Sequence, residues 1–460
     1  IYGAGSAGAQ LSASLRFSNS YAIICFVDDN RYLWGRSLNG IRIKSPLYLN
    51  EISKNDIDEI LFAIPSISKE KRRNILNNLK NIEIPFLQIP SIDEITNGDV
   101  PIDKIRPIQI EDLLGREKVP PNPSLLGPGI KNNNICITGA GGSIGAELCK
   151  QILKLSPRVI ILLDISEPNL YQTNQYLNDI KIENECKIIP VLGNAIHYKF
   201  VKDLFEKYKI NVVFHAAAYK HVPLVENNPI AGIKNNVFTT KTLCLAAKNT
   251  AVEKLIFIST DKAVRPTNIM GASKRLSELI VQAFAAQEKS AQVKNCCFSM
   301  VRFGNVLGSS GSVVPLFKKQ IETTKKITLT HPEIIRYFMT IEEAAQLVIQ
   351  AEVLAKGGEV FLLDMGEPMK ILYLAEQMIK LSGLKVKNKS NPNGDIEIIT
   401  VGLRQGEKLY EELLIDGEAM RTKHPLIYKS NESSIEPNIL WPKIEIIENY
   451  INENNLNKTL

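Results

Sequence analysis

Histidine and cysteine are scarce in this sequence and do not occur at metal-binding spacings. The chain of 460 residues has five histidines and seven cysteines, and no two cysteines form a CxxC pair. Zinc and iron–sulfur sites need such ligands at characteristic short spacings, so we expect no metal site. An odd number of cysteines without paired spacing is also typical of a protein kept in a reducing compartment such as the cytosol.

Long apolar runs and dense basic blocks are also absent. No segment approaches the ~18 consecutive apolar residues of a membrane-spanning helix. The net charge of +6 is spread along the chain without a basic cluster interleaved with aromatics, so we expect no nucleic-acid partner. The chain opens without methionine and only two residues before a glycine cluster. We therefore expect a fragment with a truncated first strand, and the missing apolar run does not bear on the intact protein.

A glycine-rich turn between a strand and a helix predicts a nucleotide-binding site. A β-rich run at 135–138 leads into Gly139, Gly142 and Gly145, and an amphipathic stretch follows at 146–153. Glycines let the backbone approach a pyrophosphate, which then lies at the positive end of the helix. A strand at 159–163 ends in Asp164, ~20 residues past the last glycine, where a carboxylate binds the ribose 2′-hydroxyl and repels a 2′-phosphate. The pattern predicts NAD rather than NADP.

The chain opens on a second turn of this kind. Gly3, Gly5 and Gly8 have GxGxxG spacing and precede a helical segment that extends to about Phe17. This small domain either binds a nucleotide or nucleotide-sugar or has a structural or regulatory role, and both remain open. Further elements are expected as follows: a strand at 22–27 ending in Asp28 and Asp29, a helix starting at Ser45 and Pro46, a strand at 60–64, a helix at 69–79 and a strand at 85–89.

The rest of the chain alternates between strand and helix patterns, which predicts an α/β fold: a Rossmann-type doubly wound parallel sheet with a smaller C-terminal substrate domain. Strands are expected at 186–192, 212–215, 255–258 and 299–302, and helices at 197–208, 229–249, 269–288, 312–325, 341–356, 368–382 and 406–415. The expected parts are an N-terminal Rossmann-like domain at 1–110, a Pro/Gly-rich linker at 111–134, a NAD-binding catalytic domain at 135–310, a mainly substrate-binding domain at 311–430 that is interleaved with the sheet, and a C-terminal extension at 431–460.

The strand at 255–258 leads into a group of candidate catalytic residues. A short-chain dehydrogenase/reductase has Ser or Thr at the end of such a strand, and then a Tyr four residues before a Lys. Here Lys274 is present, but Met270 occupies the tyrosine position. Methionine cannot take a proton, whereas Asp261 and Lys262 are ionisable and stand beside Thr260. The replacement favours a dehydratase over simple alcohol oxidation.

Five motifs together resemble the bacterial UDP-N-acetylglucosamine 4,6-dehydratases of polysaccharide and glycan biosynthesis, which are extended short-chain dehydrogenase/reductases. The resemblance runs from about Ile135 to Leu414, and it is closest to the large, membrane-anchored subgroup, which also has Met in place of the Tyr. One departure is Gly193-Asn194, where the family has Gly-Asp; Asn still donates and accepts hydrogen bonds, so we expect binding to survive. The motifs are residues 138–145, 215–223, 259–263, 302–309 and 402–408.

The resemblance implies an activity and a role for each candidate residue. The activity is NAD-dependent 4,6-dehydration: oxidation at C4, loss of water across C5 and C6, and hydride return to C6. Lys262 is the expected base at C5, a role that needs a neutral amine. Asp261 is the expected acid for the 6-hydroxyl and, in the absence of Tyr, first accepts the 4-hydroxyl proton. Thr260 would bind the C4 oxygen, Lys274 the nicotinamide ribose, and Met270 would pack beside the nicotinamide.

The resemblance also implies binding residues and partners. A homo-oligomer is expected, as is attachment to the cytoplasmic face of the bacterial inner membrane through a segment missing from this fragment, which by itself we expect to be soluble. The cofactor-binding residues are Gly139, Gly142, Ser143, Ile144, Gly145, Asp164, Asn194, Ala195, Ala216, Ala217, Ala218 and Lys274. The substrate-binding residues are Tyr219, Lys220, His221, Asn305, Arg336, Arg404 and Glu407.

Two alternatives stay open. One is another NAD-dependent sugar-nucleotide enzyme, such as a C4 or C5 epimerase, although 4-epimerases generally need the Tyr that is absent here. The other is a non-catalytic dinucleotide sensor, against which the presence of Asp261, Lys262 and Lys274 argues.

Overall fold

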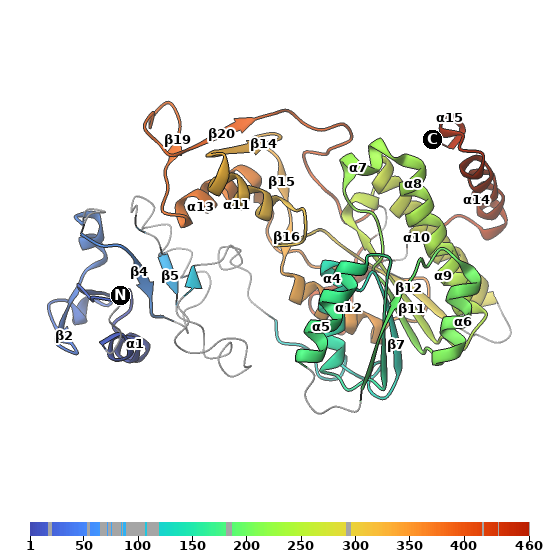
Figure 1. The fold of residues 1–460 in the computed structure, drawn as a ribbon, viewed down its shortest axis with the longest axis horizontal. Coiled ribbons are helices and arrows are strands. Elements are labelled where there is room, and N and C mark those ends of the chain that lie inside the picture. The colour runs from blue at the N-terminus through green and yellow to red at the C-terminus, as the bar shows by residue number, and fades with distance from the viewer. Residues whose placement is uncertain are drawn as a thin grey trace. The chain divides into compact units, whose positions relative to one another are not determined.

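A computed structural model describes most of the chain (Figure 1). The described residues are 1–16, 21–52, 56–64, 119–180, 186–290, 296–415, 418–430 and 432–459, with isolated positions between 71 and 107. The helix expected at 69–79 and the linker residues 111–118 lie largely outside them. The chain forms two compact units, one of residues 1–118, 316–332 and 370–401, and one of residues 119–315, 333–369 and 402–460.

The larger unit is built on one sheet of nine strands, and the parallel α/β architecture expected from the sequence is confirmed. Seven strands are parallel in the order β9-β8-β7-β10-β11-β12-β17, and β22 and β21 extend the sheet in antiparallel fashion. The order reverses between β7 and β10, which is where doubly wound sheets bind ligands. The strands are β7 (Asn134–Thr138), β8 (Val159–Asp164), β9 (Lys187–Leu192), β10 (Val212–His215), β11 (Lys254–Thr260), β12 (Cys297–Phe303), β17 (Val360–Leu363), β21 (Met420–Arg421) and β22 (Ile427–Ser430).

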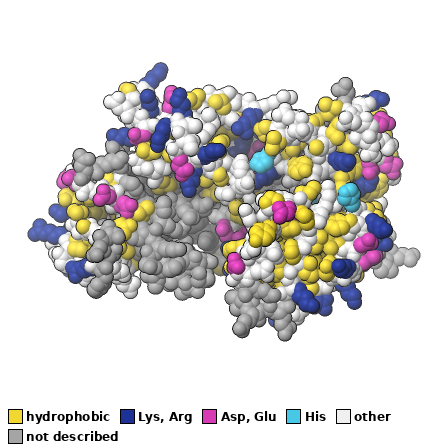
Figure 2. All heavy atoms as spheres, in the orientation of Figure 1, with side chains coloured by type: hydrophobic (Ala, Val, Ile, Leu, Met, Phe, Trp, Pro, Cys, Tyr) yellow, Lys and Arg dark blue, Asp and Glu magenta, His cyan; other side chains and the backbone are white. Residues whose placement is uncertain are grey.

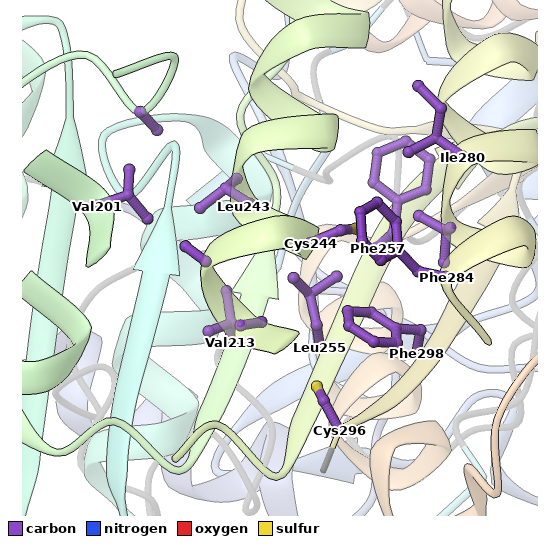
Figure 3. Close-up of a cluster of buried hydrophobic side chains, with 14 of the residues drawn as sticks. Val201, Val213, Leu243, Cys244, Leu255, Phe257, Ile280, Phe284, Cys296 and Phe298 are labelled. Carbon is purple, nitrogen blue, oxygen red and sulfur yellow. The ribbon is translucent and has the colours of Figure 1, made fainter. Parts of the chain in front are cut away.

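Helices cover both faces of this sheet, because alternate strand residues are apolar on both sides. On β11, Leu255 and Phe257 belong to one buried core, and Ile256 and Ile258 belong to the other. Figure 3 shows the first core, where Phe257 lies with Phe284 and Phe298 between the sheet and its helices. One face carries α6 (Tyr198–Tyr208), α9 (Thr239–Lys248) and α10 (Ile269–Ser290), and the other carries α4 (Ser143–Leu153), α5 (Glu167–Asp179) and α12 (Ile341–Leu354).

The helix expected at 229–249 is interrupted. It consists of α8 (Pro229–Ile233), a π-helical turn (Lys234–Phe238) and α9. Such turns widen a helix locally and are frequent at functional sites. Here the turn contains the buried Asn236, whose side chain binds a loop of the candidate site.

The smaller unit contains the first glycine-rich turn. Tyr2, which follows the N-terminal residue, makes parallel bridges to both Val27 and Phe62. The chain start therefore lies between the strands that contain these two residues. Its elements include α1 (Ser6–Arg16), β1 (Phe26–Val27), β2 (Ser37–Leu38), β3 (Ile41–Lys44), β4 (Ile60–Phe62), β5 (Phe86–Gln88), β6 (Arg106–Pro107), α13 (Ile371–Leu381), and a parallel sheet of β14 (Lys326–Leu329), β20 (Ile396–Thr400) and β19 (Val386–Lys387).

Three expectations need correction. The strand expected at 22–27 is limited to its last two residues, and the helix starting at Ser45 and Pro46 is a short 3-10 helix (Pro46–Asn50) without a side-chain cap bond. The helix expected at 406–415 does not form. Gly402 and Gly406 have φ of +90° and +72°, outside the helical region, and backbone carbonyls of this segment instead accept hydrogen bonds from Arg336.

The surface and the helices add two findings. On the face shown in Figure 2, basic and acidic side chains are interspersed rather than gathered in one block. In the part of the chain that the structure describes, no helix is long and apolar enough to cross a membrane.

Candidate active site

The glycine-rich turn after β7 leaves no room for side chains. Gly139 has φ of +68°, and a Cβ there would lie 2.7 Å from the backbone of Ala217. A Cβ on Gly145 would lie 2.0 Å from the carbonyl oxygen of Gly139. Gly142 precedes α4 and offers no side-chain cap, so the first N–H groups of the helix are available to an anion. The turn therefore fits the pyrophosphate of a dinucleotide.

Asp164 closes the turn from the end of β8. Its carboxylate is buried, with Oδ2 accepting from the Gly141 N–H and Oδ1 from the Ser166 N–H, both at 2.8 Å. Each oxygen retains a further lone pair, so the carboxylate can still accept a ribose hydroxyl. Asn194 and the buried Ala195 follow the neighbouring β9, as expected for a pocket beside the adenine.

A buried hydrogen-bond chain joins β7 and β10 beneath the turn. The Thr240 hydroxyl donates to the Asn236 carbonyl, so it accepts from His215 Nε2 at 3.0 Å. His215 Nδ1 then accepts from the Thr138 hydroxyl at 2.8 Å. Burial lowers the pKa of His215 to about 3, so the imidazole is neutral and cross-links the strands rather than serving as an acid or base.

The loop after β10 lies at the carboxyl end of the sheet. Ala216, Ala217 and Ala218 are partly buried, whereas Tyr219, Lys220 and His221 are exposed. The Asn236 amide holds this loop by accepting from the Tyr219 N–H and donating to its carbonyl. The His221 ring packs so closely on Gly311 that a Cβ there would lie 2.4 Å from the ring.

The expected catalytic residues meet at the end of β11. The Oδ1 atom of Asp261 accepts from the Thr260 hydroxyl at 2.8 Å and from Lys262 Nζ at 2.9 Å. Lys262 Nζ also donates to Asn305 Oδ1 at 3.1 Å. Asp261 is 1% exposed, and its Oδ2 atom is buried without a hydrogen-bond partner among the described residues. A buried carboxylate oxygen without a partner is costly, so this atom indicates where a ligand hydroxyl would bind.

Met270 and Lys274 lie on α10, beside this cluster. Met270 is 2% exposed and offers no ionisable group. The buried Lys274 amine donates to the Ile258 carbonyl at 2.7 Å and lies 3.9 Å above the Phe257 ring. Burial lowers the pKa of Lys274 to about 7, opposed by the nearby carboxylate of Glu278.

A buried ion-pair network supports the end of β11 from below. Arg302 is fully buried and pairs with Glu278 at 2.9 Å and with Glu432 at 2.7 Å. Glu278 also accepts from the Ser259 hydroxyl at 2.6 Å, and Arg302 donates to the Leu413 carbonyl at 2.7 Å. Burial alone would raise the pKa of Glu278, but the guanidinium brings it below its usual value. The network thereby joins β11, β12, α10 and the segment that contains Glu411.

Arg336 holds the segment that follows Gly406. It is buried, and its guanidinium donates to the carbonyls of Lys408 and Leu409. It lies 3.7 Å from the Glu407 carboxylate. Arg404 is exposed; its backbone N–H donates to the Glu407 carboxylate at 3.1 Å, and its carbonyl accepts from the Glu407 N–H at 3.0 Å. The structure thus brings Asn305 into the catalytic cluster, uses Arg336 as a support, and leaves Arg404 at the surface.

Some residues of the site were not found from the sequence. Glu411 is close enough to Asp261 and Lys262 for their charges to affect its pKa, but the sequence pattern of its segment predicts a helix. The network of Arg302 and Glu432 joins residues that are far apart in sequence. Only Glu278 could have been inferred from the sequence, because it follows Lys274 by four residues and so lies on the same face of the helix. Among the described residues, no cluster of His, Cys, Asp and Glu is suited to hold a metal.

Comparison with known proteins agrees with this geometry. Residues 135–432 match the family described as polysaccharide biosynthesis protein, and residues 1–87 match the C2185-like N-terminal family. The capsular polysaccharide biosynthesis protein CapD of Staphylococcus aureus is 41% identical over 425 residues, which is 91% of this chain and 68% of that protein. A protein named UDP-glucose 4-epimerase from Rickettsia rickettsii is 34% identical over 62% of this chain and 79% of its own.

A solved structure extends the comparison to the fold. The structure of Pen from Bacillus thuringiensis is 33% identical to this chain, covers 69% of it and 98% of its own length, and has a TM-score of 0.57. The family match covers more than half of the chain, and the CapD match includes more than two thirds of that relative. The chain therefore belongs to the polysaccharide biosynthesis protein family.

Proposed function

We propose that the larger unit is an NAD-dependent 4,6-dehydratase that converts UDP-N-acetylglucosamine to a UDP-2-acetamido-2,6-dideoxy-hexos-4-ulose, an early step of polysaccharide or glycan biosynthesis. The observation that carries the proposal is the hydrogen-bonded pair of the buried Asp261 and the partly exposed Lys262 at the end of β11, beside a Met270 that cannot act as a base.

The glycine-rich turn and its neighbours fit NAD. The N–H groups at the start of α4 would bind the pyrophosphate, Asp164 the adenine ribose, and Lys274 the nicotinamide ribose. Asn194 to Ala195 and Ala216 to Ala218 would line the same crevice. Bound NAD would supply the oxidant for C4 and return the same hydrogen to C6, so no external oxidant is consumed.

The protein's own residues solve the remaining problem, which is that the C5 proton of an unactivated sugar is not acidic. Once C4 is a ketone, C5 lies beside a carbonyl and a base can remove its proton. Thr260 would bind the C4 oxygen, and Asp261 would accept the 4-hydroxyl proton. Lys262 would remove the C5 proton. In the simplest form of the proposal, Asp261 then passes its proton to the departing 6-hydroxyl.

The substrate would extend along the carboxyl edge of the sheet. Asn305, Arg404 and Glu407 are the proposed contacts of the nucleotide diphosphate, and Tyr219, Lys220 and His221 would face the sugar or the cofactor. A guanidinium fork suits phosphate, and an exposed Arg404 is free to reach it. Arg336 would act on the substrate through the segment it supports. Self-association and attachment of the intact protein to the cytoplasmic face of the membrane belong to the same proposal.

A 4-epimerase is the second candidate, because a relative of 34% identity bears that name. The buried Met270 disfavours it, since 4-epimerases generally need a tyrosine at this position. A non-catalytic dinucleotide sensor would have no use for a buried Asp261 carboxyl group bonded to Lys262.

One incubation separates these functions. The protein is mixed with UDP-N-acetylglucosamine, without added NAD and then with it, and the products are followed by mass spectrometry and proton NMR. A dehydratase yields a sugar nucleotide that has lost one water and gained a C6 methyl group. An epimer of unchanged mass would replace the proposal by the second candidate, and no reaction under either condition would favour the sensor.

A further inference from the structure

Up to the loss of water the proposed reaction needs three proton transfers, but its assigned residues supply only two titratable groups. The 4-hydroxyl must lose a proton, C5 must lose a proton, and the 6-hydroxyl must gain one before it leaves as water. In an enzyme with tyrosine at this position, the phenol carries out one of these transfers. The Met270 thioether cannot, because it has no proton to give or take. With Lys262 at C5, Asp261 would have to act both as acceptor and as donor.

Glu411 is a second buried carboxyl group, and it lies within electrostatic range of Asp261 and Lys262. It is 9% exposed, and its Oε2 atom is buried without a hydrogen-bond partner among the described residues, as is Oδ2 of Asp261. Its segment is anchored to the catalytic turn, because Lys408 Nζ donates to the Val264 carbonyl at 2.8 Å.

The surroundings of the two carboxyl groups favour different protonation states. Asp261 accepts hydrogen bonds from the Lys262 amine and from the Thr260 hydroxyl, and accepting two such bonds favours the carboxylate form. Among the described residues Glu411 has no such hydrogen-bond donor; the Arg336 guanidinium lies 3.8 Å from its carboxyl group. When two neighbouring carboxyl groups have such different surroundings, one commonly acts as the proton acceptor and the other as the proton donor.

Burial also favours the protonated form of Glu411. It raises the pKa of this carboxyl group, and the nearby charge of Asp261 raises it further. The charges of Lys262, Arg336 and Lys408 oppose the shift but do not reverse it. Burial and the nearby Asp261 therefore favour the protonated form of Glu411 more than exposure to water would.

We propose that Glu411 is the proton donor to the departing 6-hydroxyl and that Asp261 is only the acceptor of the 4-hydroxyl proton. This inference rests on the proposed dehydratase function and deepens it.

The steps balance. C4 loses a hydrogen and two electrons, and the 4-hydroxyl proton moves to the Asp261 carboxylate. Neutral Lys262 takes the C5 proton, the C6–O bond breaks, and the Glu411 proton joins the leaving oxygen to form water. C6 regains the hydrogen and electrons lost at C4, and Lys262 returns a proton to C5. The proton on Asp261 then passes to Glu411, and the substrate has lost one water with no net change in the enzyme.

The test uses Glu411→Gln, which keeps size and polarity but cannot donate an acidic proton. In deuterated water, we expect dehydration of UDP-N-acetylglucosamine to fall by at least ~10²-fold, while solvent deuterium still enters C5 of the recovered substrate. The analogue with fluorine in place of the 6-hydroxyl should restore elimination, because fluoride leaves without a proton from Glu411. Glu412→Gln is the matched control, since that neighbour is exposed and pairs with Arg265; it should behave as the unmodified protein does with both substrates.

Three results would overturn the inference. Dehydration of the natural substrate by Glu411→Gln at the unmodified rate would remove Glu411 from the reaction. Loss of elimination with the fluorinated analogue as well would assign Glu411 a supporting role instead of proton donation. If the unmodified protein eliminates neither water nor fluoride, the proposed function fails, and this inference fails with it.

Discussion

At the scale of single residues, the site is defined by Met270 and by what surrounds it. A buried thioether takes the place where a phenol would act, and the ionisable groups sit instead on the turn after β11. Asp261, Lys262 and Asn305 form one hydrogen-bonded chain there. In the proposed function, the proton transfers at C4 and C5 of the bound sugar use this chain.

Replacing Lys262 by Met should abolish turnover while leaving the dinucleotide bound. The variant keeps the apolar stem but loses the amine, so we expect kcat to fall by at least ~10³-fold. Binding of NAD, followed by calorimetry, should be unchanged, because the glycine-rich turn does not contact this residue. Lys202→Met on the exposed face of α6 serves as the control. Turnover close to that of the control would remove Lys262 from its role as the base.

The buried Lys274 should make stability depend on pH. Its pKa is about 7 in the folded protein, against an ordinary value of 10.5. Below pH 7 the amine is charged in both states, and the cost of burying the charge is paid in full. Between these two values the unfolded chain binds more protons, so this residue's contribution to stability rises with pH.

The measurement compares the free energy of unfolding of the protein with that of Lys274→Met at several pH values. The difference, unmodified minus variant, should increase by about 1 kcal/mol per pH unit between pH 7 and 10. Of the two tryptophans, Trp441 packs on Phe284 in the larger unit, so its fluorescence in a Trp34→Phe background reports the relevant unfolding. A difference that stays flat with pH would mean that Lys274 keeps its ordinary proton affinity.

At the scale of elements, the site depends on a buried network that the sequence pattern does not reveal. Arg302 on β12 binds Glu278 of α10, Glu432 near the C-terminus and the Leu413 carbonyl. These contacts fix the segment of Glu411 relative to the end of β11. Breaking a buried pair leaves an uncompensated charge, which costs far more than losing a surface pair.

Replacing Arg302 by Met should therefore destabilise the larger unit by about 3–5 kcal/mol, measured by urea unfolding with Trp441 as the reporter. Lys202→Met, which removes an exposed pair with Glu206, should change the free energy of unfolding by no more than about 1 kcal/mol. Equal effects of the two variants would show that the buried network adds nothing to stability.

The elements found from the sequence are those with a strong local signal. The strand, glycine turn and helix at 135–153 and the buried run of β11 were predicted because glycine spacing and continuous apolar residues are local features. The segment 406–415 was wrongly predicted as helical because its residue composition suits a helix, whereas its conformation depends on Arg336 and on two left-handed glycines. Glu411 was missed for the same reason. The conformation of such segments depends on tertiary contacts, which cannot be read from a single sequence.

At the scale of the whole molecule, the same turn occurs twice. The Asp28 carboxylate accepts hydrogen bonds from the Ala4 N–H and the Asn30 N–H. The Asp164 carboxylate likewise accepts from the Gly141 N–H and the Ser166 N–H. Each unit thus closes its glycine-rich turn with an aspartate at the end of a strand, and the larger unit also contains the turn with Asp261 and Lys262.

The most direct test of the central claim follows individual hydrogens through the reaction. UDP-N-acetylglucosamine that carries deuterium at C4 is converted in ordinary water, and unlabelled substrate is converted in deuterated water. The account predicts a 4-keto-6-deoxy product with the C4 deuterium at C6 in the first case and solvent deuterium at C5 in the second. A product that has lost the C4 label to the solvent, or that has gained no solvent deuterium at C5, would contradict it.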